Sequence, residues 1–329
     1  MTDAAHRDQP SFKAAMFSGR IIPAIAWSEE GVLSVGLVLF FIAWAGYGSI
    51  TEADKPLHHD VLEAYAWGRE FKLGYNQHGP FWAWIAGFWF WVFPQTNTSF
   101  VLLAVLNATL GLFGAYRLIG LFTQGRDRQT ATLLLLATPF YTFLSFKFNA
   151  NTIFLSLWPW TLFFFVRSLD KSGWRDTILF AILAAVCILS KYYAIVLLAT
   201  CAFSLLFHDN GWKYVRSPLP YLAAGIIVLL LLPHVVWLIS SDAPPVAYAL
   251  GLTGRGSLVS LQHSAILFAS AGLYHCVVLI IILFSKYAPK GGIAGAPVRL
   301  VTNSRRKFLG ALVITPPLLT AAFGLWLQS

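Results

Sequence analysis

Long apolar runs separated by short polar stretches dominate this chain and predict membrane-spanning helices. The runs are continuous rather than alternating in polarity, and a backbone exposed to lipid must satisfy its own hydrogen bonds. The pattern therefore predicts an all-α integral membrane protein, a polytopic helical bundle forming a single transmembrane domain over residues 1–329 without a separate soluble domain. We place about nine spans, at 31–49, 98–122, 130–146, 151–167, 177–190, 193–207, 219–240, 263–285 and 308–327.

The stretch 50–97 interrupts this pattern. Its polar first part predicts a helix from Val61 to Phe71, and an apolar segment, PFWAWIAGFWFWVFP, follows at 80–94. That segment is short for a span and rich in aromatic residues, which suits the membrane interface. We expect it to be a helix on or in the membrane surface, within an extracytoplasmic loop.

The run 177–207 is long enough for one span or for two short ones. A single span would turn the basic residues between Lys286 and Lys307 to the outer side. Cytoplasmic loops carry an excess of lysine and arginine. Two helices that turn at Ser190, Lys191 and Tyr192 on the outer face are therefore favoured.

Composition and charge support the membrane assignment. The chain is 57% hydrophobic and only 11% charged, with mean hydropathy +0.67, whereas roughly a quarter of the residues in a soluble domain are charged. With the N-terminus in the cytoplasm, sixteen basic residues lie inside and six outside. The net charge of +9 is thus a signal of topology, and no nucleic-acid partner is expected.

Acidic residues gather in one part of the sequence. Five of the fourteen Asp and Glu residues lie between Glu52 and Glu70, in the segment that we place outside. Spanning a membrane does not require carboxylates at one face. An enzyme that handles a charged substrate there does require them, and this segment therefore directs the search for a site.

A motif begins within the acidic segment, and two shorter ones lie further along the chain. The first runs through Asp60, Glu63, Ala64, Tyr65, Leu73, Gly74, Tyr75, His78, Pro80 and Trp84, the second is Ser190-Lys191-Tyr192, and the third is Pro233-His234 with Trp237. Together they resemble the family 39 glycosyltransferases, which include the protein O-mannosyltransferases and the bacterial aminoarabinose transferase. This chain departs from the family pattern at Gly79, where His-Pro-Pro is usual, and at Asn149 to Thr152, where an acidic residue is frequent.

The resemblance implies the GT-C fold and a glycosyltransferase. The implied reaction moves a sugar from a polyprenyl-phosphate-linked donor, with inversion, at the outer face of a bacterial inner membrane. We expect a glycolipid or polysaccharide acceptor, as in lipopolysaccharide or cell-envelope glycan modification, because the sequence offers no protein-binding domain.

Two carboxylates are the catalytic candidates. An acceptor hydroxyl needs a base, which we expect to be Asp60, and Glu63 lies one helical turn further on. Asp60 as a helix N-cap and the pair as a capping box are the simpler alternatives.

Cationic and polar residues complete the predicted site. Lys191 and Arg255 are the candidates for binding the donor phosphate, although Lys191 can also be a lysine that snorkels at a helix end. The substrate-binding candidates are Tyr65, Tyr75, His78, Asn149, Asn151, Tyr192 and His234, with a local hydrogen bond as the plainer role of His234.

We predict no metal site. The three cysteines lie in apolar runs, and His58, His59 and His78 fit no defined ligand spacing beside the carboxylates. A divalent cation stays an open alternative. For the whole protein, the alternatives are a non-catalytic lipid or glycan transporter and a degenerate scaffold that binds lipid.

Overall fold

A computed structural model describes residues 29–53, 55, 59–251, 253, 256–285 and 302–327. The chain divides into two units, Met1–Gly36 and Leu37–Ser329. The packing described below lies within the second unit.

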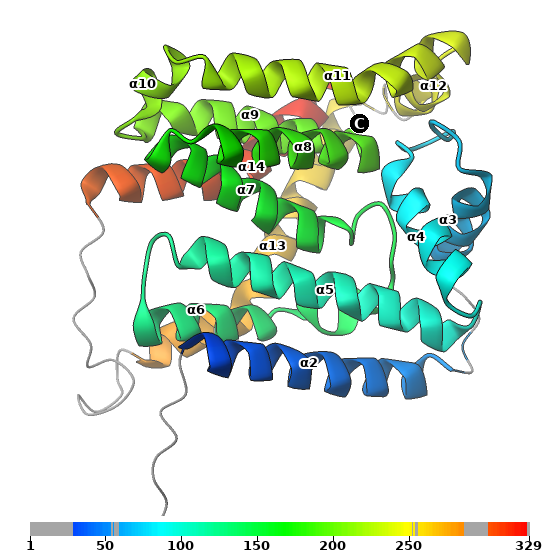
Figure 1. Cartoon of the computed structure of the whole chain (residues 1–329), viewed down its shortest axis with the longest axis horizontal. Coiled ribbons are helices and arrows are strands. Elements are labelled where there is room, and N and C mark those ends of the chain that lie inside the picture. The colour runs from blue at the N-terminus through cyan, green and yellow to red at the C-terminus, as the bar shows by residue number, and fades with distance from the viewer. Residues whose placement is uncertain are drawn as a thin grey trace, which may run out of the picture. The chain divides into compact units, whose positions relative to one another are not determined.

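Every regular element in the described residues is a helix (Figure 1). The α-helices are α2 (Glu29–Thr51), α3 (His59–Glu70), α4 (Phe81–Val92), α5 (Asn97–Ile119), α6 (Gly125–Leu136), α7 (Phe154–Lys171), α8 (Trp174–Ser190), α9 (Ala194–Ser204), α10 (Gly211–Val215), α11 (Leu219–Ser240), α12 (Pro244–Gly251), α13 (Ser257–Ser285) and α14 (Asn303–Leu327). Three 3₁₀ helices are η1 (Pro139–Tyr141), η2 (Phe143–Phe146) and η3 (Leu205–Phe207). The all-α prediction is confirmed.

Five of these helices are long and apolar enough to cross a membrane. Their spans are Glu30–Thr51, Asn97–Ile119, Leu219–Ser240, Leu258–Phe284 and Asn303–Trp326. A multi-pass membrane protein is therefore confirmed, while the count of about nine spans stays a prediction. In α7, Arg167, Asp170 and Lys171 add charge to the last turns, and α8 and α9 are shorter, at 17 and 11 residues.

The predicted span at 130–146 does not form one helix. Instead, α6 ends at Leu136, and the chain continues through η1 and η2. Proline at 139 cannot donate a backbone hydrogen bond, and it disfavours the helical conformation of the residue before it. The apolar run alone did not reveal this break.

The local predictions on either side of the site agree with the structure. Helix α8 ends at Ser190 and α9 begins at Ala194, so the run 177–207 forms two helices with a turn around Lys191. The apolar segment between the two prolines forms α4, a short apolar helix.

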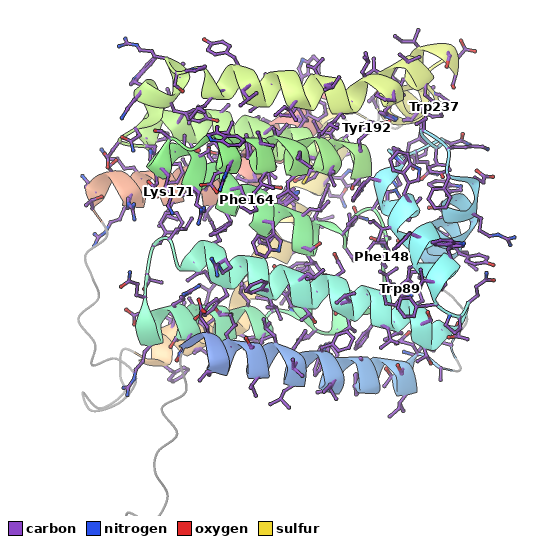
Figure 2. The ribbon with its side chains drawn as sticks, viewed as in Figure 1. Trp89, Phe148, Phe164, Lys171, Tyr192 and Trp237 are labelled. Carbon is purple, nitrogen blue, oxygen red and sulfur yellow. The ribbon has the colours of Figure 1, made fainter. Side chains whose placement is uncertain are left out.

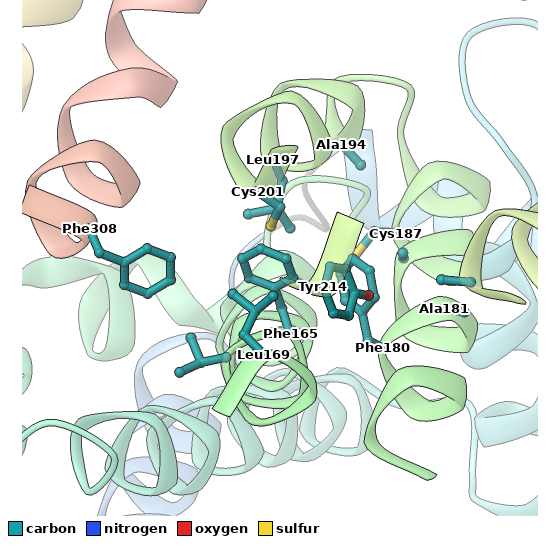
Figure 3. Close-up of a cluster of buried hydrophobic side chains, with 13 residues drawn as sticks. Phe165, Leu169, Phe180, Ala181, Cys187, Ala194, Leu197, Cys201, Tyr214 and Phe308 are labelled. Atoms are coloured by element: carbon teal, nitrogen blue, oxygen red, sulfur yellow. The ribbon is translucent and has the colours of Figure 1, made fainter. Parts of the chain in front are cut away.

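Helix α5 lies inside the bundle, whereas the later long helices are largely exposed. An 18-residue stretch of α5 is 67% buried, compared with 11% in α11 and none in α13. Because their exposed side chains are apolar, we expect lipid to cover α11 and α13. One buried cluster joins α7, α8, α9 and α14 through Phe165, Phe180, Leu197 and Phe308 (Figure 3).

Helices α3 and α4 lie at one end of α5, α8 and α11 (Figure 1). Tyr192 and Trp237 lie at that end too, while Lys171 lies at the opposite end (Figure 2). Helix α4 packs against α8. The acidic segment and the Lys191 turn thus share one end of the bundle.

Two glycines allow α3 and α4 to cross in direct backbone contact. A Cβ atom added to Gly87 would lie 2.1 Å from the Gly68 carbonyl oxygen, and one added to Gly68 would lie 2.6 Å from the Gly87 nitrogen. Backbone atoms on both sides leave no flexible side chain to move aside. This crossing therefore fixes how α3 presents its polar residues.

We expect Gly87→Ala to force α3 and α4 apart and to destabilise the protein by about 1–3 kcal/mol, the usual cost of overpacking. Thermal unfolding in detergent measures this effect. The matched control is Gly225→Ala in α11, where an added Cβ meets nothing within 4 Å. Equal unfolding temperatures for the two variants would contradict the tight crossing.

Candidate active site

The site begins with a hydrogen bond between distant parts of the sequence. The Asn149 Nδ2 group donates to Asp60 Oδ2 at 2.7 Å, joining the first turn of α3 to the turn that precedes α7. A carboxylate is favourable in the first turn of a helix, where the helix dipole is positive. Asn149 is itself buried.

The orientation of the Asn149 amide follows from its other partners. Its Oδ1 atom accepts the backbone N–H groups of Asn151 and Thr152, both at 2.9 Å. The amide oxygen is thereby committed to the turn, and only the NH₂ group remains for Asp60. An acidic residue at 149 would bring a second carboxylate oxygen to Asp60, whereas the amide supplies a hydrogen-bond donor.

Lys191 reaches the same turn from the other side. Its Nζ group donates to Asn151 Oδ1 at 2.5 Å. Burial lowers the pKa of Lys191, and the negative charge of Asp60 opposes this shift. The charge of Asp60 therefore acts on Lys191 across the asparagine turn.

The departure from His-Pro-Pro has a structural reason. A Cβ atom at Gly79 would lie 2.2 Å from the Leu189 carbonyl oxygen. Glycine lets the loop after α3 rest on the last turn of α8, directly before Lys191. The resemblance to the family did not predict this contact.

His78 lies beside Gly79 and responds to the charges of the site. Burial, followed by the positive charge of Lys191, lowers the pKa of His78 to about 4. A neutral imidazole at physiological pH is suited to binding a polar substrate group. Its ring packs edge-on against Trp67 and Trp82, with centroids 6.4 and 6.1 Å away.

Glu63 lies near Asp60 and shares a histidine with it. His59 Nε2 lies 3.3 Å from Glu63 Oε1, and His59 Nδ1 lies 3.1 Å from Asp60 Oδ1. Burial raises the pKa of Glu63, and His59 partly opposes this shift. The pair thus offers two carboxylates in different surroundings, as acid–base chemistry requires.

A metal finds no complete ligand set in the described residues. No group of three or more His, Cys, Asp or Glu side chains there is placed to hold an ion. Asp60 already accepts from Asn149 and lies beside His59. We therefore derive no step through a metal.

Two predicted substrate residues have other surroundings. Tyr65 donates to Gln95 Oε1 at 2.5 Å and borders a separate pocket of about 250 Å³. Tyr75 is buried, stacks on Trp67 with centroids 4.7 Å apart and donates to the Trp67 carbonyl oxygen. Tyr75 supports the loop that carries His78.

Tyr192 and His234 are placed against each other at the edge of the site. The Tyr192 hydroxyl lies 2.8 Å from His234 Nε2, and His234 is only 3% exposed. Arg255 and His58 lie outside the described residues. The structure thus brings together Asp60, Glu63, His78, Asn149, Asn151 and Lys191.

Sequence reasoning missed Trp67 and Trp82, the two tryptophans that pack against His78. Trp67 stands four residues after Glu63 and seven after Asp60, so helical spacing could have placed it on their face. Trp82, which is 1% exposed, carries no comparable signal.

Comparison with protein-family models gives a match over much of this part of the chain. Residues 77–237 match the family model described as dolichyl-phosphate-mannose-protein mannosyltransferase. The resemblance to the family 39 glycosyltransferases is confirmed. The mannosyltransferase match contains His78, the asparagine turn and Lys191, but it begins after Asp60 and Glu63. No curated protein and no solved structure matches the chain.

We expect Gly79→Pro, which restores the usual mannosyltransferase motif, to impair the site. Proline carries a Cβ that would collide with the Leu189 carbonyl group, so the Lys191 turn must shift. The control is Gly272→Ala in α13, where the space is open. Sugar transfer measured at matched amounts of folded protein tests this expectation. A proline variant as active as the control would refute the contact.

Proposed function

We propose that this protein is a membrane glycosyltransferase of the GT-C, family 39-like type. It transfers a sugar from a polyprenyl-phosphate-linked donor to a lipid or polysaccharide acceptor, less readily to a protein, with inversion. The mannosyltransferase match supports the donor class. The sixteen-to-six distribution of basic residues, counted for the nine predicted spans, supports a reaction at the outer face of the membrane. From the family resemblance we take this to be a bacterial inner membrane.

One observation carries the proposal: a carboxylate and a lysine converge on one asparagine turn at the end of the bundle. Asn149 binds Asp60 and Asn151 binds Lys191. A lipid-linked sugar has its phosphate at the level of the headgroups, between the membrane and water. A base at that level can take the proton of the acceptor hydroxyl, and a cation there can bind the phosphate of the donor.

Asp60 and Lys191 account for the proton and the charge that move in the proposed sugar transfer. The Asp60 carboxylate takes the proton of the acceptor hydroxyl, whose oxygen attacks the anomeric carbon. A new carbon–oxygen bond forms on one face as the bond to the phosphate breaks on the other. The polyprenyl phosphate leaves with the bonding electron pair, and Lys191 stabilises its growing negative charge.

The neighbouring residues orient the substrates. Asn149 keeps Asp60 turned towards the asparagine turn, while Asn151 holds Lys191 next to it. Glu63 and the neutral imidazole of His78 can bind sugar or acceptor hydroxyl groups. Arg255 and Tyr65 are further candidates for phosphate and substrate binding.

A non-catalytic transporter and a degenerate lipid-binding scaffold are the alternatives. A transporter is expected to carry charged groups at the middle of its spans. Asp60 and Glu63 instead lie in the short helix α3 at one end of the bundle. Only an enzyme converts a polyprenyl-phosphate sugar into free polyprenyl phosphate and glycosylated acceptor. Assaying a panel of such donors for both products tests the proposal, and their absence with every donor and envelope acceptor would contradict it.

We expect Asp60→Asn to reduce transfer by roughly 10²–10⁴-fold, the usual loss when a general base is removed. The side chain keeps an oxygen that can accept from Asn149, so folding should survive. Turnover within a few-fold of the parent would exclude Asp60 as the base, and the thermal unfolding temperature is the control.

Lys191 should make donor binding fall at alkaline pH. Its pKa is lowered by burial, so the free protein loses this positive charge at lower pH than an ordinary lysine would allow. Affinity for undecaprenyl phosphate should decline as the pH rises through the lowered pKa of Lys191. In Lys191→Arg the decline should vanish, because arginine stays charged. The same decline in both proteins would assign the titration to another group.

A further inference from the structure

His234 connects the two segments that carry the proposed site. Its Nδ1 atom lies 2.6 Å from the Leu73 carbonyl oxygen, at the start of the loop that leads to His78. Its Nε2 atom lies 2.8 Å from the hydroxyl of Tyr192, the residue after Lys191. One imidazole on α11 thus contacts both the loop and the lysine turn.

These partners determine the proton positions. A carbonyl oxygen only accepts, so His234 Nδ1 must carry a proton. In the neutral imidazole, Nε2 then offers a lone pair, and the Tyr192 hydroxyl is the donor. Burial raises the pKa of Tyr192 to about 12, which keeps this hydroxyl protonated at physiological pH. Both ring nitrogens are therefore engaged within the protein.

The packing around the ring excludes a substrate. His234 is 3% exposed and stacks on Trp237, with centroids 5.6 Å apart and an interplanar angle of 17°. Trp237 also covers Gly74, where a Cβ would lie 2.2 Å from the indole ring. Tyr192 and Trp237 lie at the same end of the bundle (Figure 2). The imidazole has no free polar atom and little exposed surface to offer a sugar.

We propose that His234 is a positioning residue that fixes Lys191 for the donor phosphate through Tyr192, rather than a residue that binds substrate. This inference rests on the proposed function. Lys191 is held by Asn151 at its ammonium group, and its backbone lies between the Gly79 contact and the Tyr192–His234 bond. Loss of that bond removes the contact that ties the turn to α11.

Binding of undecaprenyl phosphate to the protein tests the inference. We expect Tyr192→Phe, which removes one hydroxyl group, to weaken binding about three- to tenfold, the range for one lost hydrogen bond. The unfolding temperature should fall modestly, because the Nε2 atom of the buried His234 loses its donor. The matched control is Tyr193→Phe, which removes the neighbouring hydroxyl and its 2.7 Å contact with Thr320. That variant should bind as the parent does.

A double-mutant cycle separates positioning from general support of the fold. In the Lys191→Met background, Tyr192→Phe should cause no further loss, because the lysine through which it acts is gone. An equal loss in both backgrounds would overturn the inference. Unchanged binding in Tyr192→Phe, with weakened binding in Lys191→Met, would also overturn it while leaving the proposed function intact. Unchanged binding in Lys191→Met would show that Lys191 does not bind the donor phosphate. The positioning role of His234 would then be wrong as well.

The proton positions can be checked without any substrate. Nitrogen-15 NMR of labelled histidines, assigned by loss of a signal in His234→Asn, should show a neutral ring protonated at Nδ1. Tyr192→Phe should shift the Nε2 signal, whereas Tyr193→Phe should not. A ring protonated at Nε2 alone would contradict the hydrogen-bond direction and the inference built on it.

Discussion

The hydrogen bond from Asn149 to Asp60 is the interaction on which the candidate site depends. It joins residues 89 positions apart in the sequence and ties the first turn of α3 to the turn before α7. The amide can make the bond because its oxygen is already occupied by backbone N–H groups. Asn107 of α5 supports the arrangement by donating to the Thr152 carbonyl oxygen at 2.7 Å. The turn is thus hydrogen-bonded to α5, the long helix that is largely buried.

The electrostatic consequences follow from partial burial at this end of the bundle. Removing charged groups from water disfavours their charged forms. Burial therefore lowers the pKa of Lys191 and His78 and raises that of Glu63. The carboxylate of Asp60 counteracts the shift of Lys191 and so favours its charged form. A departing phosphate would add negative charge beside Lys191, and the ammonium group would stabilise that charge.

The sequence predicted the local elements well because their causes are local. Polarity and proline positions defined α4, and the distribution of basic residues decided that 177–207 forms two helices. Pro139 also had a local effect, but the apolar run around it concealed the break. The grouping of Asp60, Asn149 and Lys191 could be expected only through the family resemblance.

Contacts between distant segments were beyond what the sequence could supply. Nothing near Gly79 in the sequence indicates that it packs against Leu189, and the comparison of motifs showed only that glycine replaces the usual proline. His234 and Tyr65 illustrate the same limit. Both residues match motif positions, yet one is buried between two protein partners and the other faces a different pocket. Their surroundings depend on tertiary packing, which spacing along the chain does not encode.

The most direct measurement is a structure of the protein in a lipid nanodisc with undecaprenyl phosphate bound. The account predicts the phosphate within hydrogen-bonding distance of Lys191 Nζ, at the end of the bundle that carries α3 and α4, with Asp60 facing it across the asparagine turn. A phosphate bound at the opposite end, beside Lys171, or bound away from Lys191 with Asp60 turned from it, would contradict the account.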